Sequence, residues 1–324
     1  MLTFRARLRP RSATLSPWQA DILFGHLCWL IRYAEGRAAV DDFLADYHRG
    51  RPPLLFSNGF PGDCLPRPLG PAPPGERGPT KAAQVRAMQA AKADKDIRWL
   101  SLDEFNACRR GERVALGQRP QVLSRRTVLK NQINRLTGGT TPVEGQDEGG
   151  HLYAADELVF VDASGVSPVG LDVSIYVKAR DEALAARAEK LLKCLSRSGY
   201  GAKKSAGYGH FALASWERFT DFDEAPPDAD GFISLSNWTP ARGDPTQGFY
   251  ATMVKYGKLG ESLAVSENPF KFPLLMFKAG SSFYAGAPIR DWYGRLVADI
   301  APAAPHVVQY GYAFAVPARL DVEG

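Results

Sequence analysis

Residues 196–211 read S-R-S-G-Y-G-A-K-K-S-A-G-Y-G-H-F and mark the end of a predicted helix and the start of a predicted strand. Before them, Asp181–Leu195 repeats apolar residues at helical spacing, and after them Phe211–Trp216 alternates apolar and polar residues. Glycine commonly stands just past the C-terminus of a helix, where the backbone turns with positive φ. The stretch is therefore predicted to be a Gly-rich loop between a helix and a strand.

The composition of this loop favours an anionic ligand. Its glycines, basic and hydroxyl-bearing residues and flanking tyrosines are Gly199, Tyr200, Gly201, Lys203, Lys204, Ser205, Gly207, Tyr208 and Gly209. Glycine allows the backbone to approach a ligand closely, and lysine and serine bind phosphate oxygens. The Walker and Rossmann glycine spacings are both absent. Because a helix C-terminus is the negative end of its dipole, an anion would be held by the lysines and loop amides. The alternative is an ordinary surface turn.

Charge is segregated along the chain. The 324 residues include 40 Lys and Arg against 35 Asp and Glu, a net charge of +5. Between Lys81 and Arg135 there are 13 Lys and Arg against 5 Asp and Glu, whereas Trp216–Gly231 is acidic. A chain with this pattern is expected to meet a polyanion on one face.

Several classes of protein are not indicated. The four cysteines and five histidines are scattered, so neither a metal site nor a disulfide framework is predicted, and no cofactor motif is present. No stretch resembles a signal peptide or a membrane span. We therefore expect a cytoplasmic protein without a cofactor, a metal or a membrane partner.

The N-terminus predicts a strand followed by a helix. Leu2–Arg9 alternates strictly and places Arg5, Arg7 and Arg9 on one face, either a solvated face or one that carries nucleic acid. Ser16-Pro17 then opens a helix that contains His26. A strand followed by a helix is the first half of a ferredoxin-like unit.

Further elements are predicted in chain order. The helices are 38–48, 80–93 and 101–110, the last with a Ser101/Glu104 capping box, and the strands are 54–57, 171–178, 232–238, 249–256, 274–283 and 307–316. A Pro- and Gly-rich loop covers 58–80.

Residues 121–153 predict a long hairpin with a basic base and a glycine-rich tip, Gly138–Gly150. Its phosphate- and sugar-binding candidates are Arg125, Arg126, Lys130, Asn131, Arg135 and Thr137. The alternative is a solvated hairpin.

The ordered motifs resemble the RAMP superfamily of CRISPR proteins, and within it the family of the fourth subunit of the type III-A Csm effector complex. The segments that carry the resemblance are 14–29 with D-I-L-F-G-H-L-C-W, 55–61 (L-F-S-N-G-F-P), 131–153, 198–211, 278–283 (K-A-G-S-S-F) and 310–316. Ala202 and Ala206 stand where loops of this family often carry glycine or a polar residue.

The resemblance implies an α+β fold of two ferredoxin-like (RRM-like) domains with antiparallel sheets, a thumb hairpin and the Gly-rich loop. Residues 1–165 would form the N-terminal domain with the helical insertion and thumb, and 166–324 the C-terminal domain with the loop.

It also implies a non-catalytic subunit without a cofactor, for antiviral defence. Its partners would be the crRNA 5′ handle, target RNA near the thumb, the large polymerase-like subunit and the backbone RAMP subunit. The implied RNA-binding residues are Arg5, His26, Ser57, Asn58, Arg125, Arg126, Lys130, Asn131, Arg135, Thr137, Gly199, Tyr200, Gly201, Lys203, Lys204, Ser205, Gly207, Tyr208, Lys278 and Ser281.

Two other functions stay open. The first is a metal-independent RAMP endoribonuclease that processes crRNA, with His26 as general acid and base. The second is the equivalent handle-binding subunit of a type III-B, III-D or type I complex.

Overall fold

The computed structural model describes residues 1–70, 80–82, 84–85, 89, 97–112, 116–117, 123–131, 133, 139, 152–161, 170–286 and 288–320. The helices within them are α1 (Ala20–Glu35), α2 (Arg37–His48), α4 (Leu102–Arg109) and α5 (Glu182–Ser198), with 3-10 turns η1 (Lys204–Ala206) and η2 (Glu261–Val265). The strands are β1 (Leu2–Pro10), β2 (Leu54–Phe56), β3 (Phe60–Pro61), β4 (Leu65–Pro66), β5 (Trp99–Leu100), β6 (Leu123–Asn131), β7 (Leu152–Phe160), β8 (Val173–Ala179), β9 (Phe211–Arg218), β10 (Gly231–Ser234), β11 (Gly248–Phe249), β12 (Thr252–Lys255), β13 (Leu274–Phe277), β14 (Ser282–Tyr284), β15 (Trp292–Val297) and β16 (Gln309–Ala318).

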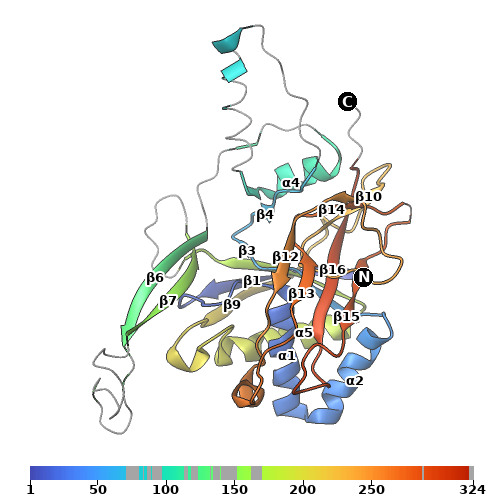
Figure 1. Ribbon diagram of the computed structural model, residues 1–324. Helices are drawn as coiled ribbons and strands as arrows, with labels where there is room; N and C mark the ends of the chain where they lie inside the picture. The colour runs from blue at the N-terminus through green and yellow to red at the C-terminus, as the bar shows by residue number, and fades with distance from the viewer. Residues whose placement is uncertain are drawn as a thin grey trace.

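The first sheet has the antiparallel order β2-β8-β1-β9, and β3 also pairs with β8. With α1 after β1 and α5 after β8, the chain follows the β-α-β-β-α-β order of a ferredoxin-like unit. The predicted alternation in β1 is confirmed, because Phe4, Ala6 and Leu8 are buried. The sheet and its two helices lie together in the lower half of Figure 1.

The predicted domain division at residue 165 does not follow this sheet. β1 pairs with β8 on one side and with β9 on the other, so one sheet is built from strands on both sides of residue 165. The predicted division groups each strand with the helix nearest to it along the chain. The structure instead completes the first unit with strands and a helix from beyond the hairpin.

The second sheet has the order β11-β14-β10-β16-β15. In the described residues from 219 to 320 the chain forms strands and η2 but no α-helix. The α+β class is confirmed, but this second sheet has no helix pair of its own, unlike the ferredoxin-like domain predicted there. Instead α1 and α2 pack against β16 and β15.

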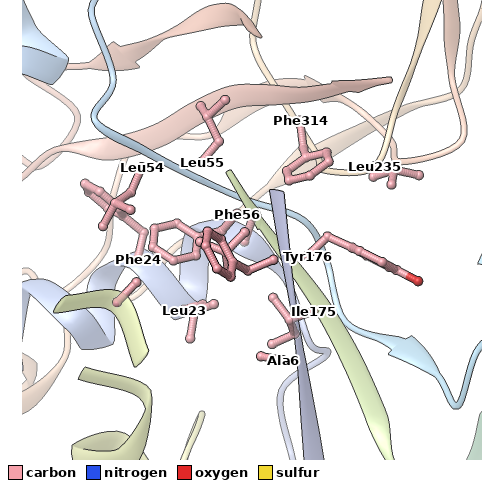
Figure 2. Packing of buried hydrophobic residues seen from close by; sticks show 14 of the residues in the cluster. Ala6, Leu23, Phe24, Leu54, Leu55, Phe56, Ile175, Tyr176, Leu235 and Phe314 are labelled. Carbon is pink, nitrogen blue, oxygen red and sulfur yellow. The ribbon is translucent and has the colours of Figure 1, made fainter. Parts of the chain in front are cut away.

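β16 explains how the two sheets share one core. Its side chains alternate between two faces, and Tyr310, Tyr312 and Phe314 join the cluster that contains α1 and the first sheet. Ala313 and Ala315 face the second cluster. Figure 2 shows Phe314 in one cluster with labelled residues of α1, β2 and β8, and α1 and α2 pack against strands of the second sheet as well.

Some predicted elements have different bounds. The helix predicted at Ser16 begins at Ala20, and the strands predicted at 249–256 and 274–283 each divide into two. The Ser101/Glu104 capping box is present. β15 was not predicted. Most of the predicted helix 80–93 and of the hairpin tip Gly138–Gly150 lies outside the described residues. Among the described helices, none combines the length and apolar character of a membrane span.

A buried lysine joins the two sheets. The Lys178 side chain on β8 is 4% exposed, and its Nζ donates to the Ala315 carbonyl at 2.8 Å and lies 3.0 Å from Asp291 Oδ1. The Met1 amino group also contacts Asp291, at 2.9 Å. Burial opposes charge on this carboxylate, but Lys178 and the N-terminus outweigh it and lower the pKa of Asp291.

We predict that Asp291→Ala lowers the free energy of unfolding by about 3 kcal/mol, because it leaves Lys178 as a buried charge without its counter-ion. Asp41→Ala is the matched control, since it removes an exposed partner of Arg37 and should cost about 0.5 kcal/mol or less. Denaturant unfolding of both variants measures the difference, and equal losses would contradict this role of Asp291.

Candidate nucleic-acid interface

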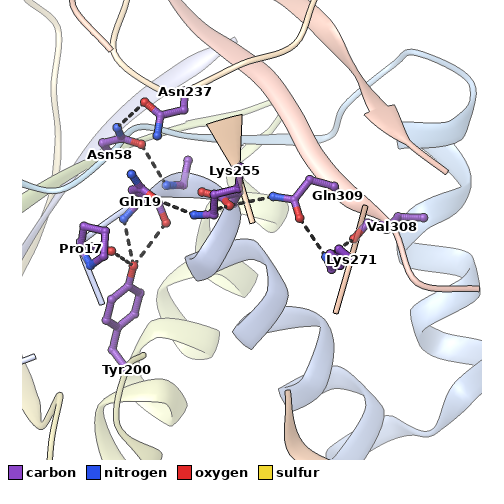
Figure 3. Close-up of polar contacts among 11 residues, drawn as sticks. Pro17, Gln19, Asn58, Tyr200, Asn237, Lys255, Lys271, Val308 and Gln309 are labelled. Atoms are coloured by element: carbon purple, nitrogen blue, oxygen red, sulfur yellow. Dashed lines mark hydrogen bonds and ion pairs between the residues drawn. The ribbon is translucent and has the colours of Figure 1, made fainter. Parts of the chain in front are cut away.

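Tyr200 attaches the Gly-rich loop to the start of α1. The Tyr200 ring is 0% exposed and stacks on Trp18 with centroids 4.1 Å apart. Its hydroxyl donates to the Pro17 carbonyl at 2.7 Å and accepts from the Gln19 N–H at 2.9 Å, as Figure 3 shows. The first N–H groups of a helix lack partners within the helix, so a buried helix start needs such acceptors. Tyr200 therefore anchors the loop to α1, and because its ring is buried the structure does not favour its predicted contact with RNA.

His26 holds the next residue of the loop. The Gly201 N–H donates to His26 Nε2 at 2.8 Å, and the Ala202 N–H donates to Ser16 Oγ at 3.1 Å. Burial and the nearby Lys204 charge lower the pKa of His26 to about 4, although Glu261 opposes this. His26 is thus a neutral acceptor with its Nε2 lone pair in use. This geometry does not favour a general acid and base role.

Two glycines allow the loop to pack this closely against its neighbours. A Cβ at Gly209, where φ is +69°, would lie 1.8 Å from the Tyr200 carbonyl oxygen. One at Gly201, where φ is +80°, would lie 2.8 Å from Ser16 Cβ. Both positions combine positive φ with close packing, so only glycine fits without distortion.

The other side of the loop is tied to the β6–β7 hairpin through Glu157. The Tyr208 hydroxyl donates to Glu157 Oε1 at 2.9 Å, and Arg126 Nε donates to Glu157 Oε2 at 2.7 Å. Burial would raise the pKa of Glu157, but these hydrogen bonds outweigh it and lower the pKa. Tyr208 therefore acts within the fold: it is 6% exposed and lies on the protein side of the loop.

Two lysines add cation–π contacts between the hairpin and the loop. Lys130 Nζ lies 4.9 Å from the Tyr208 ring centroid, and Lys203 Nζ lies 3.8 Å from that of Tyr153. Lys203 has a φ of +54° and is exposed to solvent. The loop and the hairpin strands therefore form one continuous surface.

The predicted RNA-binding residues divide by exposure. Those exposed to solvent are Arg125, Arg126, Asn131, Lys203, Ser205, Gly207 and Lys278. Lys130 is half-buried, and so is Lys204, which forms an ion pair with Glu261 at 2.5 Å. Gly199 is buried and Gly201 half-buried. Arg135 and Thr137 lie outside the described residues.

Three polar candidates hold the fold together. Ser57 Oγ, 1% exposed as a residue, accepts from the Tyr176 N–H at 2.8 Å. Asn58 Oδ1 accepts from the Ala20 N–H at 3.0 Å and so caps α1 from a distant segment. Ser281 is fully buried, and its Oγ accepts from the Ala251 N–H at 3.3 Å. Because these side chains are buried, the structure does not favour the RNA contacts predicted for Ser57 and Ser281.

The arginine face of β1 is occupied by carboxylates. Arg5 contacts Glu217 at 2.5 Å and Asp63 at 3.0 Å, and its side chain is 16% exposed. Arg7 also contacts Asp63, at 2.6 Å. The acids come from segments far away along the chain, so the sequence pattern did not reveal them. These pairs do not favour the predicted role of Arg5 in RNA binding.

A buried polar network beside the loop was missed. Lys255 Nζ lies 2.8 Å from Asp21 Oδ2, and Gln309 Nε2 donates to the same oxygen at 2.7 Å. Lys271 Nζ donates to Gln309 Oε1 at 2.8 Å, and burial lowers the pKa of Lys271 to about 8. Figure 3 shows these side chains converging on the first turn of α1. Isolated polar residues at four places in the chain give no local signal for such a network.

Comparison with known proteins finds a similar sequence and structures with a similar fold. No family model matches the chain. It is 25% identical to the CRISPR system protein Csm4 of Streptococcus thermophilus over 285 residues, 83% of this chain and 81% of the relative.

Solved structures share the fold. A chain of the Csm1–Csm4 cassette bound to pppApA is 18% identical with a TM-score of 0.60, and each chain is covered over 100% of its length. A chain of the Csm3–Csm4 subcomplex of a type III-A interference complex is 14% identical with a TM-score of 0.55, covering 98% of this chain and 100% of that one. The resemblance to the fourth Csm subunit that was predicted from the sequence is confirmed by the similarity to Csm4, and the solved structures share its fold.

The His26 contact predicts a pH-dependent stability. In the folded chain the pKa of His26 is about 4 against 6.5 for free histidine, so only the unfolded chain takes up this proton between these values. The stabilising contribution is complete above pH 6.5 and is lost as the pH falls through about 4, a change of up to about 3 kcal/mol.

His26→Gln removes the titrating group, so its free energy of unfolding should fall less steeply over this window than that of the parent. The exposed His48→Gln is the control and should keep the parent's slope. Denaturant unfolding at a series of pH values measures this. A His26→Gln slope equal to the parent's would exclude the assigned role.

Proposed function

We propose that this chain is a non-catalytic, RNA-binding subunit of a type III-A CRISPR interference complex, in which it binds the 5′ handle of crRNA. Support comes from the similarity to Csm4 over 83% of the chain and from the fold shared with chains of Csm1–Csm4 and Csm3–Csm4 structures.

One observation carries the proposal: the inner side of the Gly-rich loop is bound to α1, while its outer side carries one exposed lysine and one exposed serine. Tyr200 and His26 hold the loop against α1, whereas Lys203 and Ser205 are exposed. A rigid loop that presents a hydroxyl and an ammonium group can bind phosphate oxygens without losing much conformational freedom.

The β6–β7 hairpin extends this surface. Arg125, Arg126 and Asn131 are exposed on it, and the Tyr208–Glu157 contact fixes its base beside the loop. We assign this hairpin as the thumb, which would reach target RNA near the guide. Guanidinium and amide groups bind phosphate and sugar, so the surface is suited to an RNA backbone and carries no base-reading code of its own.

Protein partners follow from the same similarity. The related chains were solved in a Csm1–Csm4 cassette and in a Csm3–Csm4 subcomplex. By analogy, this chain would anchor a large polymerase-like subunit and a backbone RAMP subunit. Co-purification of the neighbouring subunits would separate a type III-A complex from type III-B, III-D and type I.

The competing endoribonuclease would need His26 to exchange protons with RNA. The His26 Nε2 already accepts the Gly201 N–H, and burial keeps the imidazole neutral. We therefore expect repeat RNA to remain intact when it is incubated with the chain in EDTA. Cleavage that is lost in His26→Ala would contradict the non-catalytic assignment.

We predict that Lys203→Ala weakens binding of handle-bearing RNA and reduces the slope of log affinity against log salt by about 1, because one phosphate contact is lost. Lys190→Ala, an exposed lysine on α5, is the matched control with an unchanged slope. Filter binding over a range of salt concentrations measures both. If Lys203→Ala bound the RNA as tightly as the control, the loop would not be the surface that binds the phosphates.

A further inference from the structure

A cavity outside the proposed handle site lies between α1 and η2. Its volume is about 370 Å³, enough for a small planar ligand. The lining residues are Trp29, Arg32, Tyr33, Ser262, Leu263 and His306. They come from the outer face of α1, from the η2 turn and from the segment that precedes β16. The orange η2 turn lies beside the lower part of α1 in Figure 1.

An aromatic surface faces this cavity. Trp29 and Tyr33 are four residues apart on α1, and their rings stack with centroids 5.6 Å apart and planes at 28°. Tyr33 is 63% exposed, so much of its ring is open to a ligand. Burial and Glu261 raise the pKa of the Tyr33 phenol, which therefore stays protonated. A planar aromatic ligand could extend the stack.

The rim of the cavity carries cationic and hydroxyl groups. Arg32 and His306 are both exposed, and Arg32 forms no ion pair with any residue in the described ranges. Ser262 adds a hydroxyl. Glu261, which precedes Ser262 in the chain, is paired with Lys204 at 2.5 Å. Aromatic rings, a guanidinium and a hydroxyl together match a nucleotide: the rings suit its base, and the guanidinium its phosphate.

The cavity continues the surface of the Gly-rich loop. The Lys204–Glu261 ion pair connects the loop to η2 directly. His26, under the loop, and Tyr33, in the cavity, are seven residues apart and lie on the same face of α1, about 10 Å along its axis. That distance corresponds to about three stacked nucleotides. A strand that follows the loop past Lys204 would therefore reach the cavity next.

We propose that this cavity binds one nucleobase of the RNA strand that leaves the Gly-rich loop, stacked on Tyr33 and Trp29, with the adjoining phosphate on Arg32. This inference rests on the proposed RNA-binding function. Stacking accepts any base because every base has a π-face, so the site fixes the path of the strand and reads no sequence.

The test is photo-crosslinking of the full chain to handle-bearing RNA that carries 5-iodouridine at one position at a time. We expect one position to crosslink to the α1 peptide that contains Trp29 and Tyr33. In the same RNA, Tyr33→Ala should lose this crosslink and bind about 5- to 100-fold more weakly. Tyr256→Ala is the matched control, since Tyr256 is 75% exposed and is not among the residues that line the cavity.

Ser262→Trp provides a second variant that fills the cavity and removes no aromatic ring, so the crosslink should again be lost. If the RNA binds but every crosslink lies in the loop and hairpin, or if Tyr33→Ala binds like Tyr256→Ala, the cavity proposal is overturned while the proposed function stands. If the parent chain does not bind the RNA at all, the proposed function fails and this inference fails with it.

Discussion

The structure depends on the hydrogen bonds that the Tyr200 hydroxyl makes with backbone groups at the start of α1. Tyr200 accepts the Gln19 N–H and donates to the Pro17 carbonyl, while its ring stacks on Trp18 in the core. A buried helix start without such partners would carry a large desolvation cost. The loop between α5 and β9 is therefore part of the packing of α1, and its outer surface is fixed as a consequence. A loop held in this way is suited to binding because it loses little entropy when a ligand arrives.

α1 packs against both sheets, and these contacts fix the position of the candidate interface. The helix packs against β2 of the first sheet, against α5 and against β16 of the second sheet. At its N-terminus, Asp21 is held by Lys255 and Gln309 from the second half of the chain. Because these contacts are buried, movement of the second sheet would disturb the helix and the loop on it. The loop, the hairpin base and the cavity beside η2 therefore form one connected surface.

The sequence predicted local structure well and long-range pairing poorly. The alternation in β1, the helix α5 and the capping box of α4 are set by neighbouring residues, so periodicity and capping rules revealed them. The pairing of β1 with β8 and β9 depends on residues more than 160 positions away, so the first sheet does not follow the division predicted at residue 165. For the same reason Arg5 looked free in the sequence, since its partners Asp63 and Glu217 are distant along the chain.

The candidate site was predicted by residue type but not by role. The glycines and lysines of the loop were found because their composition is unusual, whereas the functions of Tyr200 and His26 depend on a packed helix that no motif encodes. The most direct test of the central claim, that this chain binds a crRNA handle, is to purify it with its native partners and sequence the bound RNA. We predict RNA with one common 5′ end derived from a CRISPR repeat. Absence of RNA, or RNA with scattered 5′ ends, would contradict the claim.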